Sequence, residues 1–136
     1  MTVAGYSGTP LVKKLGIAPG AKVAILGAPD GFDATLGELP EGAVVTRRLG
    51  GRRDLVLVFV TERAALAGRL DALRAAIAPD GMIWVAWPKK AAQMPTDVTE
   101  NVVREVVLPT GLVDVKVCAI DATWSGLKVV IRKELR

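Results

Sequence analysis

Two short runs of apolar residues most restrict the folds that this sequence can adopt. Residues 21–27 (AKVAILG) and 54–60 (DLVLVFV) are apolar almost throughout and lack the alternation of a strand with one wet face. Such runs indicate strands that are buried on both sides, which are typical of parallel sheets covered by helices on both faces. We therefore expect layers of helix packed on a mostly parallel sheet.

The rest of the chain alternates between helix and strand patterns. Further strands are expected at residues 43–49, 82–87, 113–120 and 127–133. Helices are expected at residues 10–15, 61–77 and 96–108, with one helical turn at 33–36. Residues 79–81 (PDG) should end the second helix, and residues 121–126 have the composition of a hairpin turn.

Capping residues and apolar spacing support these helices. Thr9 and Thr61 are predicted N-caps, and Asp97 and Glu100 have the spacing of a capping box. Apolar residues three or four positions apart mark the buried face of the middle helix, namely Leu66, Leu70, Leu73 and Ile77. Valines recur every four residues in the last helix, although valine also favours strands, at Val98, Val102 and Val106.

This order of elements predicts the fold class. Strands that alternate with helices form right-handed β-α-β units and hence a parallel sheet, to which the final hairpin adds an antiparallel strand. A chain of 136 residues has the size of one ordinary domain. We expect a single Rossmann-like α/β domain over residues 1–136, with a mostly parallel sheet and a C-terminal antiparallel hairpin.

Several chemistries are excluded by composition. The sequence has no histidine, which rules out Ser-His and Cys-His nucleophile systems and imidazole metal sites. Its one cysteine, Cys118, forbids an intrachain disulfide, and its place in an apolar run indicates a buried thiol; no metal site is expected. The N-terminus lacks the order of a signal peptide, and no apolar run approaches ~20 residues. We expect a cytoplasmic, soluble protein.

Basic residues gather in one short segment. The net charge is +4, and Arg47, Arg48, Arg52 and Arg53 contribute most of the excess against Asp54. Three interpretations stay open: a phosphate site for nucleic acid or a 2′-phosphorylated dinucleotide, a surface for an acidic partner, and charge that protects a sheet edge from pairing. No aromatic residue is interleaved with these arginines, which disfavours nucleic acid.

Four segments together suggest a family relationship. They are residues 17–20 leading into 21–27, residues 54–57 (DLVL), residues 73–84 (LRAAIAPDGMIW) and the closing hairpin. Along nearly the whole chain this pattern resembles the class I S-adenosylmethionine-dependent methyltransferases. In the order given, the four segments are similar to that family's first strand, its fourth strand, the helix–Pro–Gly–strand step that follows, and its last two strands. The resemblance implies a Rossmann-like fold and S-adenosylmethionine as the cofactor.

The resemblance fails at the two main cofactor contacts. That family has a glycine-rich turn after its first strand, where the backbone approaches the cofactor closely. Here Gly27 is followed by Ala28, which adds a Cβ, and by Pro29, which removes a backbone donor. The family also has an acidic residue at the end of its second strand for the ribose hydroxyls, whereas residues 46–48 of this chain are TRR.

A second resemblance covers the full length. The phrases YSGTPLVKKLG, WVAWPKK and VCAIDATWSGL together resemble a family of short bacterial proteins that is defined as a domain of unknown function. This resemblance implies no activity. It suggests that residues 6–9 fold as a lid over the ligand end of the sheet.

The fold class nominates the candidate ligand-binding residues. In open α/β sheets, ligands bind beyond the carboxyl ends of the strands, near the point where the strand order reverses. Residues that follow the expected strands are Gly27, Asp30, Thr61, Glu62, Trp87, Lys89, Lys90, Asp121, Thr123, Trp124 and Ser125. Lysines beside tryptophans suit an anionic or aromatic ligand. Alternatively, the tryptophans cover the end of the sheet and the lysines are solvated.

Three functions follow from these observations. The sequence favours a non-catalytic or repurposed module, without a predicted cofactor, that binds a small molecule or a protein. The first alternative is an S-adenosylmethionine-dependent methyltransferase with an atypical turn, in which Gly27 and Asp30 contact the cofactor. The second is a nucleic-acid-associated protein that uses Arg47–Arg53. No membrane partner is expected, and an exposed sheet edge would allow a homodimer.

Overall fold

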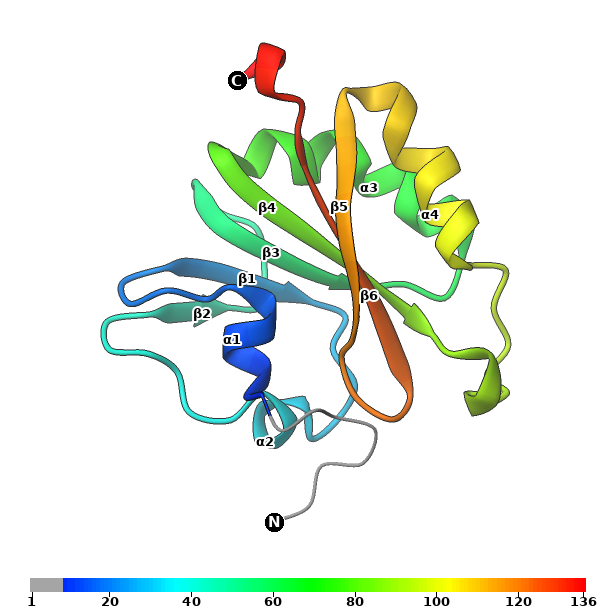
Figure 1. Ribbon diagram of the computed structural model, residues 1–136, viewed down its shortest axis with the longest axis horizontal. Helices are drawn as coiled ribbons and strands as arrows, with labels where there is room; N and C mark the ends of the chain where they lie inside the picture. Colours follow the sequence, from blue (N-terminus) through cyan, green and yellow to red (C-terminus); the bar gives the residue numbers. More distant parts are fainter. Residues whose placement is uncertain (1–8) are drawn as a thin grey trace.

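The computed structural model describes residues 9–136, which form a six-stranded sheet with helices on both faces (Figure 1). The strands are β1 (Lys22–Leu26), β2 (Val44–Thr46), β3 (Arg53–Phe59), β4 (Ile77–Pro88), β5 (Leu112–Ala119) and β6 (Trp124–Ile131). The α-helices are α1 (Leu11–Leu15), α2 (Phe32–Leu36), α3 (Arg63–Ala76) and α4 (Glu100–Val107). Three 3-10 helices are η1 (Lys90–Ala92), η2 (Leu108–Thr110) and η3 (Lys133–Leu135).

The strand order is β2-β1-β3-β4-β6-β5. Strands β1 to β4 are mutually parallel, and β6 lies antiparallel between β4 and β5. Strand β5 therefore runs in the direction of β4, and the turn between β5 and β6 lies at the carboxyl ends of the parallel strands. The α/β class, the mostly parallel sheet and the closing antiparallel hairpin are confirmed. The chain order reverses at β1, which has β2 on one side and β3 on the other.

Each face of the sheet has its own apolar core. On the front, defined here as the side of α1 and α2, Leu55 and Leu57 of β3 pack with residues of these two helices. On the rear, Val56 and Val58 pack with α3 and α4. All four of these β3 side chains are at most 1% exposed, which confirms that the run 54–60 is a strand covered on both sides.

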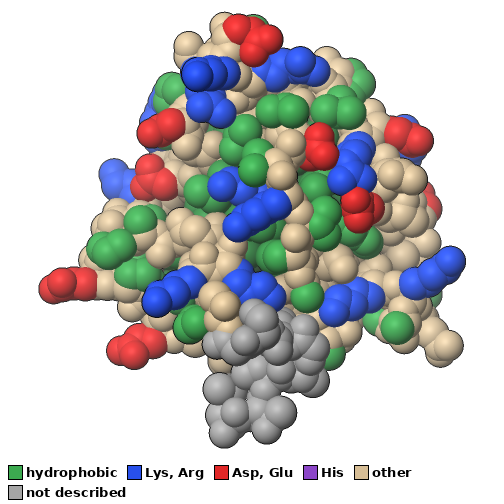
Figure 2. Space-filling view, viewed as in Figure 1, with side chains coloured by type: hydrophobic (Ala, Val, Ile, Leu, Met, Phe, Trp, Pro, Cys, Tyr) green, Lys and Arg blue, Asp and Glu red, His purple; other side chains and the backbone are tan. Residues whose placement is uncertain are grey.

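The front face is not uniformly apolar. Figure 2 shows Lys and Arg side chains over the middle of this face, with apolar side chains between them. Lys116 of β5 and Lys128 of β6 are register partners, and Lys128 is also the register partner of Trp84. Since register partners project from the same face of a sheet, both lysines lie on the front, beside the α1–α2 core.

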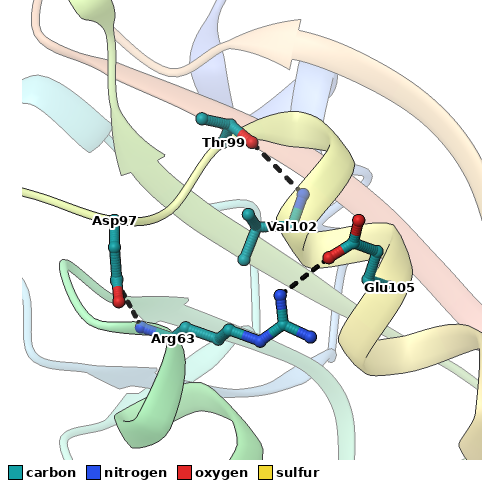
Figure 3. A network of polar contacts seen from close by, with 5 residues as sticks. All are labelled: Arg63, Asp97, Thr99, Val102 and Glu105. Atoms are coloured by element: carbon teal, nitrogen blue, oxygen red, sulfur yellow. Dashed lines mark hydrogen bonds and ion pairs between the residues drawn. The ribbon is translucent and has the colours of Figure 1, made fainter.

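Two predicted N-caps are wrong. Helix α1 begins at Leu11 with Pro10 in the cap position, one residue later than the Thr9 cap predicts. Helix α3 has Glu62 as its N-cap, without a side-chain bond. The carboxylate Oδ1 of Asp97 instead accepts a hydrogen bond of 2.7 Å from the backbone N–H of Arg63 (Figure 3). A side chain 34 positions away in the sequence thus takes the place expected for Thr61.

Helix α4 forms where expected but begins later and buries other valines. Its N-cap is Thr99, whose hydroxyl accepts a hydrogen bond from the N–H of Val102 at 3.2 Å, so the predicted Asp97–Glu100 capping box is wrong (Figure 3). Val103 and Val107 are the buried residues of the helix, while Val102 and Val106 are half-buried. An ion pair of 2.7 Å between Arg63 and Glu105 links α3 to α4 on the surface.

Several strand boundaries differ from the expected ones. Strand β2 has only three residues, because the chain leaves β1 after Thr46. Strand β4 begins at Ile77, so the predicted turn at 79–81 is an irregular part of the strand, where the register with β3 shifts. Strand β6 begins at Trp124, inside the expected turn.

No helix within residues 9–136 is long and apolar enough to cross a membrane. The proposed lid lies almost entirely outside the described residues.

Candidate functional site

The site is built around Gly27, the first residue after β1. Gly27 has φ +71°, a left-handed conformation that side chains disfavour. A Cβ at this position would lie 3.1 Å from the carbonyl oxygen of Phe59, at the end of β3. Glycine is therefore required here by the close approach of two neighbouring strands. The resulting turn leaves space on both sides of the end of β1.

A front cavity of about 400 Å³ opens on the side of α2. It is lined by Ile25, Gly27, Ala28, Pro29, Asp30, Gly31, Phe32, Asp33 and Arg47. An ion pair joins Arg47, which follows β2, to Asp33 in the first turn of α2. Asp30 forms no such pair within the described part of the chain. The ionisable groups of the front cavity are thus two carboxylates and one guanidinium.

A rear cavity of about 350 Å³ opens on the side of α3. It is lined by Leu26, Gly27, Arg47, Arg48, Leu49, Arg69, Ala72 and Leu73. Three of these residues are arginines and none is acidic. Leu49 packs on the rear core, so the floor of the cavity is apolar. Gly27 and Arg47 line both cavities, which therefore meet at the end of β1.

Three aromatic rings pack in a row beneath the ligand end on the front face. The rings of Phe32 and Phe59 meet edge to face with centroids 5.0 Å apart, and Phe59 meets Trp124 in the same way at 5.0 Å. All three are at least 93% buried. Phe32, at one end of this row, also lines the front cavity. The row could not be predicted from the sequence, because Phe32 and Phe59 are isolated aromatic residues in segments far apart.

The candidates on β4 and the hairpin form a second group. The backbone N–H of Lys89 donates to the carbonyl oxygen of Thr123 at 2.7 Å, which brings the end of β4 against the hairpin turn. The carboxylate of Asp121 accepts hydrogen bonds of 2.8 Å from the N–H groups of Thr123 and Trp124. Asp121 therefore holds the turn in shape. None of this group lines the cavities at Gly27.

The tryptophans of this group are core residues on opposite faces of the sheet. Trp87 packs in the rear core and is 7% exposed, whereas Trp124 packs in the front core and is 6% exposed. Ser125 is the register partner of Trp87 and is half-buried. Lys90 is exposed in η1. The geometry thus favours tryptophans that cover the end of the sheet over a pair that clasps one ligand.

The four arginines do not line one common cavity. Arg47 and Arg48 lie at the cavities beside Gly27, whereas Arg52 lines a cavity near the start of β4. Arg53 donates to the hydroxyl of Thr46 at 3.2 Å. Strand β2 is an outer strand of the sheet, as the edge-protection interpretation expects. Arg53 also lies close to Arg48 through Thr46, whose hydroxyl donates to the carbonyl of Arg48 at 2.9 Å.

The remaining candidates lie outside the two cavities. The carbonyl of Thr61 accepts a hydrogen bond of 2.7 Å from the hydroxyl of Thr96, and Glu62 caps α3 and is exposed. Cys118 is half-buried against the front core, and burial raises the pKa of its thiol, with Lys14 and Lys116 acting in the opposite direction. No group of three or more His, Cys, Asp or Glu that could hold a metal ion occurs within residues 9–136.

The residues beside Gly27 do not fit S-adenosylmethionine in the manner that the methyltransferase resemblance implies. The ribose carboxylate expected at the end of β2 is absent, and Arg47 and Arg48 stand beyond Thr46. The hydroxyl of Thr46 is itself engaged, since it donates to the carbonyl of Arg48 at 2.9 Å. Pro29 offers no N–H to a ligand. Gly27 alone matches the expected contacts.

Comparison with solved structures gives the fold a name. A SAM-dependent methyltransferase from Aquifex aeolicus matches with a TM-score of 0.63 and 14% identity, over 88% of this chain and 86% of that one. The fibrillarin pre-rRNA processing protein of Methanococcus jannaschii matches with a TM-score of 0.61 and 12% identity, over 90% and 73%. The chain has the methyltransferase fold.

Another structure with this fold was solved with its cofactor. The magnesium protoporphyrin IX methyltransferase of Synechocystis PCC 6803, with bound SAM, matches with a TM-score of 0.58 and 13% identity, over 89% of this chain and 74% of that one. No protein-family model matches the sequence, and no curated protein does either. The methyltransferase fold is thus shown by structure alone, and the resemblance to a short bacterial family stays a prediction.

Proposed function

We propose that this chain is a small-ligand-binding module of the methyltransferase fold, and that its ligand is a phosphorylated nucleoside bound across the end of β1. The observation that supports this most is the rear cavity, in which three arginines and no acidic residue surround an apolar floor. A base or ribose can pack on an apolar floor, and guanidinium groups bind phosphate oxygens in pairs. The cavity also lies where the strand order reverses, the usual ligand position in such sheets.

Arg48 and Arg69 are the residues assigned to the phosphate. Both are exposed, and neither side chain forms an ion pair within the described residues. Arg47 is held by Asp33 and would line the passage between the two cavities. The front cavity would then take the uncharged part of a ligand too large for the rear cavity alone.

The test is a thermal unfolding and calorimetric titration with adenosine, AMP, ADP and ATP at constant ionic strength. A ligand at 100 times its dissociation constant stabilises the folded state by about 2.7 kcal/mol, which raises Tm by several degrees. We expect the phosphorylated compounds to bind and a double variant, Arg48→Gln with Arg69→Gln, to lose at least tenfold in affinity. Arg132→Gln, beyond the far end of β6, is the matched control. If the unmodified protein, the double variant and Arg132→Gln all bound the phosphorylated compounds equally weakly, the proposal would be contradicted.

A second candidate is an S-adenosylmethionine-dependent methyltransferase with an atypical turn. The front cavity favours it, because Gly27 and Asp30 lie there and Asp30 forms no ion pair within residues 9–136. A carboxylate suits the positive sulfonium of that compound. S-Adenosylmethionine and S-adenosylhomocysteine therefore belong in the same titration. Binding of these two compounds that is weakened by Asp30→Asn, without binding of ATP, would replace the first proposal by this one. Methyl transfer to candidate acceptors would then be assayed.

A further inference from the structure

A third cavity lies at the opposite end of the sheet, away from the site proposed above. Its volume is about 460 Å³, larger than either cavity at Gly27. Arg52, Asp71, Arg74, Ala75, Ile77, Pro79, Ile131, Leu135 and Arg136 line it. These residues come from the residue before β3, the last turns of α3, the first part of β4, the end of β6, η3 and the residue after it, at the top of Figure 1.

Arg74 lines this cavity and also carries a donor without a partner among the described residues. It lies in the last turn of α3, and its Nε is buried without a hydrogen-bond partner among the described residues. The guanidinium lies beside Gly111, just before β5, where a Cβ would be 3.4 Å from its Nη2. A buried donor of a charged group without a partner destabilises the folded chain, so such groups are usually satisfied by water or by a ligand.

Positive charge exceeds negative charge around this cavity. Arg52, Arg74 and Arg136 line it, and Asp71 is the only carboxylate side chain among the lining residues. Arg136 donates through Nε to the carbonyl oxygen of Ile131 at 2.8 Å, and its side chain forms no ion pair with the described residues. The side chains of Arg52 and Arg74 form no ion pair within residues 9–136.

The shape of the cavity restricts the anion further. Ile77, Pro79 and Ile131 give it an apolar wall, and Leu135 of η3 adds an apolar side chain that is 51% exposed. Three guanidinium groups around one hollow can share an anion with several oxygens, because each presents a planar pair of donors. Phosphate and pyrophosphate offer such oxygens in more than one plane, whereas a single carboxylate offers two in one plane.

We propose that the cavity formed by Arg52, Arg74 and Arg136 is a second, independent anion site, which binds a phosphate or pyrophosphate group of a small molecule. The anion accepts hydrogen bonds from Arg74 and is held from the open side by Arg52. This site does not depend on the nucleoside site at Gly27, because it shares no lining residue with the two cavities there.

The test uses pyrophosphate and inorganic phosphate as probes, with sodium chloride holding the ionic strength constant. The background is the Arg48→Gln, Arg69→Gln double variant, so that anions at the rear cavity do not contribute. Calorimetry measures affinity, and NMR follows the arginine Nε–H signals. We expect pyrophosphate to shift the Arg74 Nε–H signal, and Arg74→Lys and Arg52→Gln each to weaken binding at least tenfold. Lysine keeps the charge and the stem of Arg74 but has no planar fork.

Lys90→Gln in the same background is the control and should bind as before, because Lys90 is exposed in η1 at the other end of the sheet. The proposal would be overturned if pyrophosphate did not bind more strongly than chloride. It would also be overturned if the Arg52→Gln variant bound pyrophosphate with unchanged affinity. This second variant keeps the test valid even if substitutions at Arg74 disturb folding. If the pyrophosphate affinities of all variants lie within tenfold of one another, binding reflects the overall charge of the protein. That result would also reject the site. A short oligonucleotide is the third probe, and its binding without binding of pyrophosphate would assign the surface to nucleic acid and contradict a small-molecule site.

Discussion

The indole Nε1 of Trp84, on β4, donates a hydrogen bond of 2.8 Å to the carbonyl oxygen of Leu15, the last residue of α1. Trp84 is fully buried in the front core, so this bond fixes α1 against the middle of the sheet. Trp84→Phe leaves the carbonyl without its partner and leaves a cavity. We expect a loss of about 2–4 kcal/mol in the free energy of unfolding, measured by urea titration. Trp87→Phe, which removes an indole without a hydrogen bond among the described residues, should cost less.

The close approach of Gly27 to β3 gives a second prediction. Gly27 and Gly31 both have a left-handed φ, +71° and +80°, so alanine at either site costs about 1–2 kcal/mol in backbone conformation. Only at Gly27 would the new Cβ also meet a backbone oxygen, that of Phe59 at 3.1 Å. Gly27→Ala should therefore destabilise the protein by about 1–3 kcal/mol more than Gly31→Ala. Equal losses in denaturant titrations would show that the ends of β1 and β3 can separate freely.

The pH dependence of stability should depend on Asp114. The Nε of Arg104, on α4, donates to the carboxylate of Asp114, on β5, at 2.9 Å. This hydrogen bond lowers the pKa of Asp114 from its ordinary value of 3.8. Because the carboxyl is more acidic in the folded chain, its contribution is fully present above pH about 4 and is lost as the pH falls through the folded pKa.

Asp114→Asn should accordingly reduce the free energy of unfolding at neutral pH, and the difference from the unmodified protein should disappear in acid. The measurement is urea unfolding at a series of pH values from 7 down to about 2. Glu38→Gln, at an exposed position in the loop after α2, is the control and should leave the profile unchanged. A constant difference at every pH would mean that the side chain acts by packing alone.

Asp121 should govern the stability of the closing hairpin. Its carboxylate accepts from two consecutive N–H groups, so Asp121→Ala leaves two donors to find other partners, and we expect a loss of about 1–2 kcal/mol. Asp121→Asn keeps an acceptor oxygen and should lose less. Hydrogen exchange at the amides of Thr123 and Trp124 would report the change directly. Unchanged protection in the alanine variant would show that β4 and β6 alone hold the turn.

The sheet could be predicted from the sequence where both faces are buried. Residues 54–60 are apolar on both faces, and an inner strand of a parallel sheet is the element in which both faces of such a run are buried. Helix starts were predicted less well, because the groups that satisfy them come from far away. Asp97 reaches the first turn of α3 from the segment before α4, a contact that exists only once the two helices pack.

The candidate site was predicted in part. Gly27, Asp30, Arg47 and Arg48 line the cavities at the end of β1, and their binding role stays a prediction. The contribution of Arg69 could not be foreseen, since it belongs to an exposed helix face that meets the segment after β2 only in the folded chain. Likewise, Arg52, Arg74 and Arg136 are far apart in the sequence and converge because β3, α3 and β6 all begin or end at the same side of the sheet.

The position of β6 has a consequence for how the protein is made. Strand β6 is the last strand in the chain, yet it lies between β4 and β5 and forms the hydrogen bonds that join them. During synthesis on the ribosome, β5 has no neighbouring strand until residues 124–131 have left the exit tunnel. Its exposed backbone is then open to pairing with other chains, so nascent protein should depend on chaperones until the last strand is inserted.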